Sequence, residues 1–383
     1  MSRMSRFLTV SLGAALLLGA AVPALAANGC TINFKAKNLA TGTNPQTIVT
    51  GDFNRDGNPD FAVADYNGGS AGSVSVFLGN GDGTFQPKKD YAVGEGPDAL
   101  AAGDVNGDGV ADLVTGNDTA FSVSVLIGNG DGSFQTHQDY STGRYPHGVA
   151  LGDFNNDHAP DIAAVNEGDN TVSIFLNNGD GTFGAMKTFT TPGEPFYVIA
   201  RDFNADHNTD LAVAGYGNSV IGILIGRGDG TFKTYKQYVT GSSPIGIAAA
   251  DFNGDKILDL ASANYTGGSS GSVSILLGKG DGTFGTHTDY SSGGAGAYNL
   301  VVGRFNGDTN LDVAVTNLIG SSMSILPGNG DGTLGAAQTW TTPEYPLGIG
   351  AARFHGQGKT KEDVVVSNDL ANDATVFRNK GCQ

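Results

Sequence analysis

Residues 52–60 read Asp-Phe-Asn-Arg-Asp-Gly-Asn-Pro-Asp, and the pattern that they contain, Asp-x-Asn-x-Asp-x-x-x-Asp, recurs along the chain. Complete copies begin at Asp52, Asp104, Asp153, Asp202 and Asp251, and two eroded copies begin at Arg304 and Arg353. Successive copies start 52, 49, 49, 49, 53 and 49 residues apart. A unit of this length cannot bury its apolar face alone, so the period is typical of an array in which neighbouring units share their cores.

Each unit reads as four short strands. In the third, 146–153, 162–166 and 171–176 favour strands, and a fourth follows the Gly-Asp-Gly turn at 179–181. The chain has 60 Gly and many short runs of Val, Ile, Thr, Phe and Tyr, and no helical periodicity of useful length follows residue 27. This composition indicates an all-β protein with many tight turns. We therefore predict one domain, residues 27–383, folded as a seven-bladed β-propeller of four-stranded antiparallel blades.

The two ends of the chain are out of phase with the repeat. The last unit stops near Asn379, where a fourth strand should start, whereas residues 30–41 read like a fourth strand. The N-terminal strand is therefore predicted to pair with the last blade and close the ring, leaving no open edge. This pairing places Cys30 beside Cys382, and no other cysteine exists. We predict a disulfide between them; the alternative, lipid modification of Cys30, lacks the preceding Leu-type residue.

Residues 1–26 read as a secretory signal. Arg3 and Arg6 precede an apolar run over residues 7–21, and Ala24-Leu25-Ala26 offers a cleavage site before Ala27. A membrane anchor is the alternative, but the run is short for a span. The mature chain is expected to be secreted, extracellular or periplasmic, without a membrane span. The net charge of −17 becomes −19 without the signal, which disfavours nucleic acid and anionic membranes as partners.

The nine-residue pattern has the oxygen spacing that calcium requires, because alternate residues of a tight loop can converge on one ion. Asp52, Asn54 and Asp56 offer side-chain oxygens, Asn58 a backbone carbonyl, and Asp60 closes the site. Loops of Asx turns without an ion are the alternative, but three carboxylates so close would repel. We expect about five structural Ca²⁺ ions. The equivalent residues in the other complete copies are Asp104, Asn106, Asp108, Val110 and Asp112; Asp153, Asn155, Asp157, Ala159 and Asp161; Asp202, Asn204, Asp206, Asn208 and Asp210; and Asp251, Asn253, Asp255, Ile257 and Asp259.

The two eroded copies are expected to bind no ion. Arg304 replaces the first Asp of the sixth copy, so its guanidinium is predicted to take the place of the ion. The seventh copy begins at Arg353 and keeps only Asp363. A helix-loop-helix calcium site is excluded, because its twelfth position requires Glu and is Val63 in the first copy.

The Phe-Asn pairs at 53–54, 154–155, 203–204 and 252–253, each with its acidic loop, resemble the FG-GAP or VCBS-type repeat propellers. That family includes the head of integrin α subunits and several seven-bladed fungal lectins, and the resemblance covers nearly the whole mature chain. It implies that the metal loops join the first and second strands of each blade on one face and are structural. It also implies that ligands bind on the opposite face or between blades.

The opposite face is expected to be rich in tyrosine. Aromatic rings with hydrogen-bonding neighbours suit sugars or protein partners, although a single Tyr could merely pack against the next blade. Asp98, Asp118, His147 and Glu167 are expected on the same face. The candidate ligand-binding residues are Tyr66, Tyr145, Tyr197, Tyr216, Tyr265, Tyr298 and Tyr345. A second series is predicted to pack between blades: Tyr91, Tyr140, Phe189, Tyr238, Tyr290 and Trp340.

These features favour a calcium-binding adhesion or recognition module with a carbohydrate or protein ligand. The sequence leaves its oligomeric state open. The alternative is a calcium-dependent polysaccharide lyase or a glycosidase acting on an extracellular polysaccharide, since acids from different blades can meet at the axis without a sequence motif. No nucleophilic Ser context is present, and no catalytic residue is assigned.

Overall fold

The computed structural model describes residues 30–69, 71–356 and 361–382. The predicted signal segment 1–26 lies outside these residues, as does the site of its cleavage. Within them, no helix is long and apolar enough to cross a membrane.

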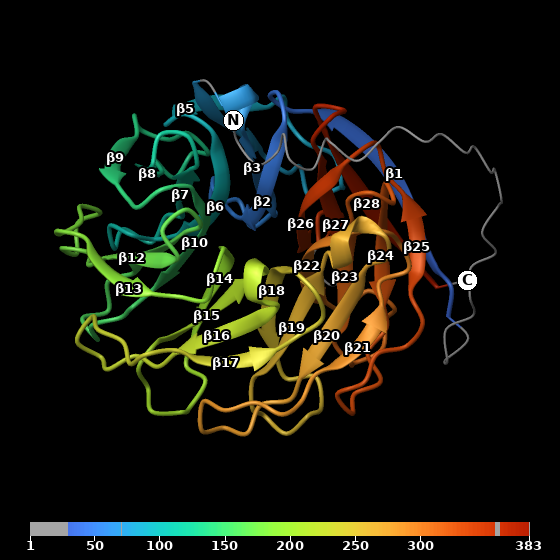
Figure 1. Cartoon of the computed structure of the whole chain (residues 1–383). Coiled ribbons are helices and arrows are strands. Elements are labelled where there is room, and N and C mark those ends of the chain that lie inside the picture. Colours follow the sequence, from blue (N-terminus) through green and yellow to red (C-terminus); the bar gives the residue numbers. More distant parts are fainter. Residues whose placement is uncertain (1–29, 70, 357–360, 383) are drawn as a thin grey trace.

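The described chain forms seven four-stranded antiparallel sheets arranged in a ring (Figure 1), which confirms the predicted propeller. In six blades the strands follow chain order, and the first strand of each lies nearest the axis. The strands of these blades are β2 (Pro45–Gly51), β3 (Asp60–Asp65), β4 (Gly72–Phe77) and β5 (Lys89–Val93); β6 (Pro97–Gly103), β7 (Asp112–Asn117), β8 (Ser122–Leu126) and β9 (Gln138–Ser141); β10 (Pro146–Gly152), β11 (Asp161–Asn166), β12 (Thr171–Phe175) and β13 (Lys187–Thr190); β14 (Pro195–Arg201), β15 (Asp210–Gly215), β16 (Val220–Leu224) and β17 (Lys236–Val239); β18 (Pro244–Ala250), β19 (Asp259–Asn264), β20 (Ser272–Leu276) and β21 (Thr288–Ser291); and β22 (Ala297–Gly303), β23 (Asp312–Asn317), β24 (Ser322–Leu326) and β25 (Gln338–Thr341). Short 3-10 turns are η1 (Asn67–Gly69), η2 (Tyr216–Asn218) and η3 (Thr266–Gly268).

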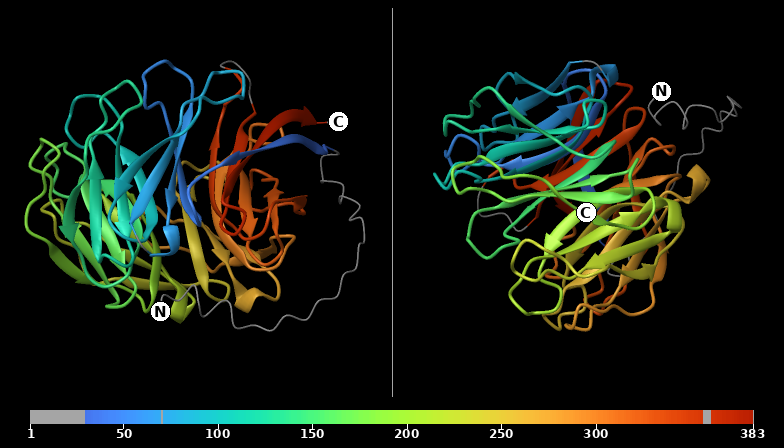
Figure 2. Two further views of the ribbon diagram at one scale, coloured as in Figure 1. Left: turned by 90° about the horizontal axis from the view of Figure 1, so that it is seen from above. Right: turned by 60° about the vertical axis from the view of Figure 1, so that its left-hand side comes forward.

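The seventh blade is built from both ends of the chain. Its sheet runs β1 (Ile32–Ala40), β28 (Asp373–Cys382), β27 (Asp363–Asn368) and β26 (Pro346–Ala352). Figure 2 shows the blue N-terminal strand beside the red last blade. A disulfide joins Cys30 to Cys382, with their Cα atoms 5.3 Å apart. The predicted closure and disulfide are both confirmed, and the pairing leaves β28 with no open edge.

The core lies between blades rather than in one central mass. Every residue of the second strand of each blade is buried, because the neighbouring blades cover both of its faces. Aromatic residues of the fourth strands pack edge-on against rings of the next blade, such as Tyr91 on Phe134 with centroids 5.3 Å apart. Phe34 of β1 meets Trp340 in the same way at 5.0 Å. These contacts match the inter-blade packing that the regular spacing predicted.

Candidate functional site

The acidic loops connect the first and second strands of the blades. In the first loop, Asp60 is fully buried and accepts hydrogen bonds from the backbone N–H groups of Phe53 (2.8 Å) and Gly79 (2.7 Å). Asp52 accepts from the N–H groups of Asp56 (3.1 Å) and Gly57 (2.9 Å). These bonds curl the loop and tie it to the end of the third strand. The last Asp makes the same two bonds in the other complete loops, at Asp112, Asp161, Asp210 and Asp259.

Electrostatics in these loops favour a bound cation. Burial raises the pKa of Asp60 to about 6; hydrogen bonds from Gly79 and Phe53 oppose the shift, and the charges of Asp56 and Asp52 add to it. The pKa values of Asp161 and Asp210 are raised to about 6 for the same reasons. The negative charges of Asp56 and Asp52 thus oppose ionisation of Asp60, and a cation in the loop would relieve this repulsion. The donor set of each loop therefore fits a hard cation such as calcium.

The donors are held by hydrogen bonds within the loop. The amide of Asn54 donates to Asp56 Oδ2 (2.9 Å), and Asn106, Asn155, Asn204 and Asn253 do the same in their loops. Across the described ranges, no group of three or more His, Cys, Asp or Glu side chains is gathered closely enough to hold a metal ion. The loops thus provide suitable oxygens without a preassembled cluster.

The two eroded loops use basic side chains instead. Arg304 folds back over its own loop, and its Nε donates to the carbonyl of Thr309 (3.1 Å). In the seventh loop His355 stands where Asn54 stands in the first, and its Nδ1 lies 2.6 Å from the buried Asp363 Oδ2. The sequence reading missed His355, although its place in the repeat marks it. His355 thus places a basic group beside the acidic residue that remains in the seventh loop, whereas the side chain of Arg304 bonds to the backbone of its own loop.

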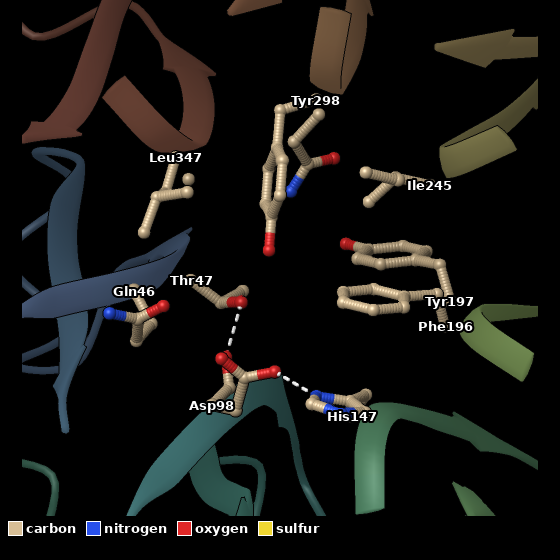
Figure 3. A pocket seen from close by; sticks show the side chains of 11 residues that line it. Gln46, Thr47, Asp98, His147, Phe196, Tyr197, Ile245, Tyr298 and Leu347 are labelled. Carbon is tan, nitrogen blue, oxygen red and sulfur yellow. Dashed lines mark hydrogen bonds and ion pairs between the residues drawn. The ribbon is translucent and has the colours of Figure 1, made fainter. Parts of the chain in front are cut away.

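On the opposite face, seven side chains surround the axis, one from the start of each first strand. In every blade this position lies in a β-bulge, where the pairing register with the second strand shifts. A bulge turns a side chain away from its regular direction, here toward the axis. These residues line a small, partly open cavity of about 20 Å³ (Figure 3). We call them the axial ring: Gln46, Asp98, His147, Phe196, Ile245, Tyr298 and Leu347.

The axial ring has a polar arc and an apolar arc. Gln46, Asp98 and His147 form the polar arc from blades one to three, whereas the residues of blades four to seven are aromatic or aliphatic. In the apolar arc, Phe196 lies edge-on to Tyr298, with ring centroids 6.2 Å apart. The residue before the ring position is Pro in six blades and Ala in one, yet the ring position itself holds seven different residue types. The repeated units therefore share the same backbone conformation at this position but differ in the side chain that they place there.

His147 is enclosed by carboxylates. Its Nδ1 lies 2.6 Å from Asp98 Oδ2, and its Nε2 lies 3.3 Å from Glu167 Oε2 and 3.9 Å from Asp118 Oδ1. The imidazole also stacks on Phe196, with centroids 4.5 Å apart and planes 8° apart. Burial lowers the pKa of His147, but the three carboxylates outweigh it and raise the pKa to about 10. His147 is thus an imidazolium at neutral pH.

A second layer of acids stands behind the polar arc. Asp118 is 3% exposed; its Oδ2 accepts from the Tyr66 hydroxyl (3.1 Å), whereas its buried Oδ1 has no hydrogen-bond partner among the described residues. Asp369 accepts from the amide of Gln46 (3.2 Å). Burial raises the pKa values of Asp118 and Asp369 to about 6, so both carboxylates are mostly ionised at neutral pH.

Comparison with known families identifies the repeat. The model of the FG-GAP-like repeat matches residues 52–115, 104–164, 153–213, 202–262 and 251–315, which together exceed half of the chain. The chain belongs to the FG-GAP-like repeat family. The resemblance inferred from the acidic loops is therefore confirmed. No match was found among curated proteins.

Solved structures share the propeller of this FG-GAP-like chain. A structure of streptogramin B lyase aligns with a TM-score of 0.61 at 13% identity, covering 91% of this chain and 98% of the other. A catalytically inactive virginiamycin B lyase from Staphylococcus aureus with quinupristin aligns with a TM-score of 0.60 at 14% identity, covering 90% and 99%. At such identities the likeness establishes the fold alone.

The candidate tyrosines of the FG-GAP-like propeller divide into three groups. Tyr197 and Tyr298 line the axial cavity. Tyr66 is buried against Asp118, and Tyr145 packs edge-on against Phe121 with centroids 5.1 Å apart. The remaining three, Tyr216, Tyr265 and Tyr345, join an apolar cluster with Phe196, Ile245, Leu318 and Leu347.

Asp98 and His147 were predicted on this face but not in the ligand site, and four ring residues were not predicted at all: Gln46, Phe196, Ile245 and Leu347. The signal that marks all of them is the position after Pro at the start of each unit.

The charge of His147 gives a direct test. NMR titration of the imidazole is expected to show a protonated ring well above pH 6.5, with deprotonation near pH 10. The folded pKa exceeds the ordinary value of 6.5, so the stabilisation from His147 is complete below pH 6.5 and is lost as pH rises through about 10. Asp98→Asn should lower this pKa, because it removes the nearest carboxylate. A wild-type ring that titrates near 6.5 would contradict the arrangement.

Proposed function

We propose that this protein is an exported, calcium-stabilised binding module that holds a carbohydrate or protein ligand at the axial ring. The observation that carries the proposal is the ring itself. In a chain built from repeated units, the seven axial positions differ in residue type while the Pro-bulge backbone around them repeats. If these side chains only packed against one another, the same apolar residue could serve in every blade. Their different residue types therefore favour a role in ligand recognition.

The calcium part of the proposal rests on the five complete acidic loops. When bound, calcium would neutralise the carboxylates and draw six to eight oxygens around itself. In the first loop, Asp52, Asn54, Asp56 and Asp60 would hold the ion with the backbone carbonyl of Asn58, and the other four loops offer the same set. The loops lie at the opposite end of the first strands from the axial ring, so the ion would support the blades rather than contact the ligand.

Export is supported by the sequence of residues 1–26 and by the cystine. Disulfides persist in oxidising compartments and are rare in the cytosol. The bond between Cys30 and Cys382 therefore agrees with a secreted or periplasmic protein. The mature N-terminus, which peptide sequencing of the exported protein would identify, is expected at Ala27.

The enzyme alternative has one supporting observation, since acids of different blades do meet at the axis. Asp98 and Glu167 come from the second and third blades and converge on His147. Both are engaged by the imidazolium, which leaves His147 unsuited to act as a base at neutral pH. Incubation with pectin, alginate and rhamnogalacturonan is expected to give no rise in absorbance from unsaturated uronate products. A calcium-dependent rise that Asp98→Asn abolishes would favour the lyase.

Binding at the axial ring is tested with glycan arrays and panels of extracellular proteins. For any ligand found, Tyr298→Ala is expected to weaken binding by about 2 kcal/mol, roughly 30-fold, because buried aromatic residues dominate such interfaces. Tyr290→Ala on the outer strand β21 is the matched control, since it removes the same side chain far from the axis. Equal losses in both variants, or none in Tyr298→Ala, would move the ligand site elsewhere.

A further inference from the structure

We infer that the axial ring binds an alkyl cation, a primary ammonium or guanidinium group on an apolar stem, as carried by a free amine or by a lysine or arginine side chain. This inference deepens the proposed function and rests on the same face. It follows from the division of the ring into a polar arc and an apolar arc. A ligand that fits both arcs needs a charged group and an apolar group.

The polar arc supplies the negative charge. The Asp98 side chain lines the cavity and is 14% exposed. Its Oδ2 is paired with His147, whereas its Oδ1 has no hydrogen-bond partner within the described ranges. Thr47 lies beside it, and its hydroxyl donates to the Asp98 carbonyl (2.7 Å). A cation entering here would find one free carboxylate oxygen.

Among the described residues, the charge around the cavity is not balanced. Four carboxylates, from Asp98, Asp118, Glu167 and Asp369, stand against the single imidazolium of His147. Arg144 of the same face is already paired with Asp169 (2.8 Å). Asp118 also buries an oxygen that no described donor reaches. A buried excess of negative charge is costly, so an external cation close to Asp98 would stabilise the site.

The apolar arc faces this charge across the cavity. Figure 3 shows the Tyr298 hydroxyl pointing toward Thr47 and Asp98, with the rings of Phe196 and Tyr197 to one side of the cavity. The hydroxyl of Tyr298 has no hydrogen-bond partner in the described part of the chain, so it is available to a ligand. The ring of Tyr298 can attract a cation, and Phe196, Ile245 and Leu347 can pack on an alkyl stem.

Size and donor type narrow the ligand class. The enclosed space of about 20 Å³ has room for about one water-sized group, which suits a single cationic head with its stem at the open mouth rather than an oligosaccharide. A bare metal ion would leave the apolar arc unused.

Calorimetric titration of the mature, calcium-loaded protein tests the inference. The probes are n-butylammonium, n-butylguanidinium and neutral n-butanol, which has nearly the same shape. At least one cation is expected to bind saturably and at least tenfold more tightly than butanol. A peptide with one lysine and its acetylated form distinguish a protein side chain from a free amine as the source of the cation.

Variants assign the effect to the ring. Asp98→Asn is expected to weaken cation binding about tenfold or more, whereas Glu95→Gln, the same change at an exposed position three residues earlier, should leave it unchanged. If Asp98→Asn melts early, Phe196→Leu keeps all charges and should weaken binding by removing one ring. Cations that bind no better than butanol, or equally to wild type and a folded Asp98→Asn, would overturn the inference.

These experiments distinguish failure of the cation inference from failure of the proposed function. A ligand lost in Tyr298→Ala, with no binding of either cation and no competition by them, leaves the axial face as the binding site but refutes the cation. Cation binding that depends on Asp98 supports the inference even if glycan and protein panels give nothing. Absence of both kinds of binding refutes both.

Discussion

Excess chelator is expected to lower the melting temperature of the mature protein by roughly 10 °C or more, compared with millimolar calcium. A ligand that binds only the folded state adds about 2.7 kcal/mol per site when its concentration is 100-fold above Kd. Five loops would then contribute roughly 13 kcal/mol together. The blades share their cores, so the loss is expected as one cooperative shift rather than five separate steps. Scanning calorimetry with and without calcium measures it.

Single-loop variants show that the effect comes from the acidic loops. Asp56→Asn removes one carboxylate from the first loop. It should reduce the calcium-dependent stabilisation by about the contribution of one site, roughly 2.7 kcal/mol. Asp82→Asn is the matched control, because Asp82 is an exposed acid of the turn after β4 that bonds only within its turn and to Arg378. Equal melting temperatures in chelator and calcium, or equal effects of the two variants, would refute calcium in these loops.

Replacing both Cys30 and Cys382 by Ser is expected to lower the free energy of unfolding by about 6 kcal/mol in the chain-entropy model. The bond closes a loop with a sequence separation of 352 residues, and the loss of chain entropy in the unfolded state grows with loop length. The bond also fastens β1 to β28 at the seam, so its removal should let the N-terminal strand detach and expose a sheet edge. Urea unfolding of the variant and the oxidised wild type measures the difference.

Reduction provides the control for the substitution. Wild-type protein unfolded in reductant should resemble the Cys30→Ser/Cys382→Ser variant, because both lack only the covalent link. Hydrogen exchange should report faster opening in β1 than in β11, the buried second strand of the third blade. An unchanged midpoint, or exchange that rises equally in both strands, would contradict a role at the seam.

The number of blades, the order of strands and the closure of the ring could all be predicted from the residues alone. A near-constant period fixes how many units exist, and the phase of the chain ends fixes which blade receives β1. The disulfide followed from that phase, since Cys30 and Cys382 have no alternative partners. These features depend on the repeat period and on where the chain ends fall within the repeat, and both can be read directly from residue numbers. Calcium binding by the acidic loops remains a prediction. The sequence shows which oxygen ligands each loop offers, but it does not show whether an ion is bound there.

The axial ring, by contrast, could be recognised only from the folded arrangement of the blades. Its members lie about 49 to 53 residues apart. Their side chains reach the axis because a bulge at the start of each first strand re-aims them. Alternation along a strand would not predict that direction. The tyrosines were predicted from their residue type, whereas Gln46, Phe196, Ile245 and Leu347 were not predicted. The raised pKa of His147 also depends on the fold. Asp98 and Glu167 belong to separate segments that meet where the second and third blades pack together.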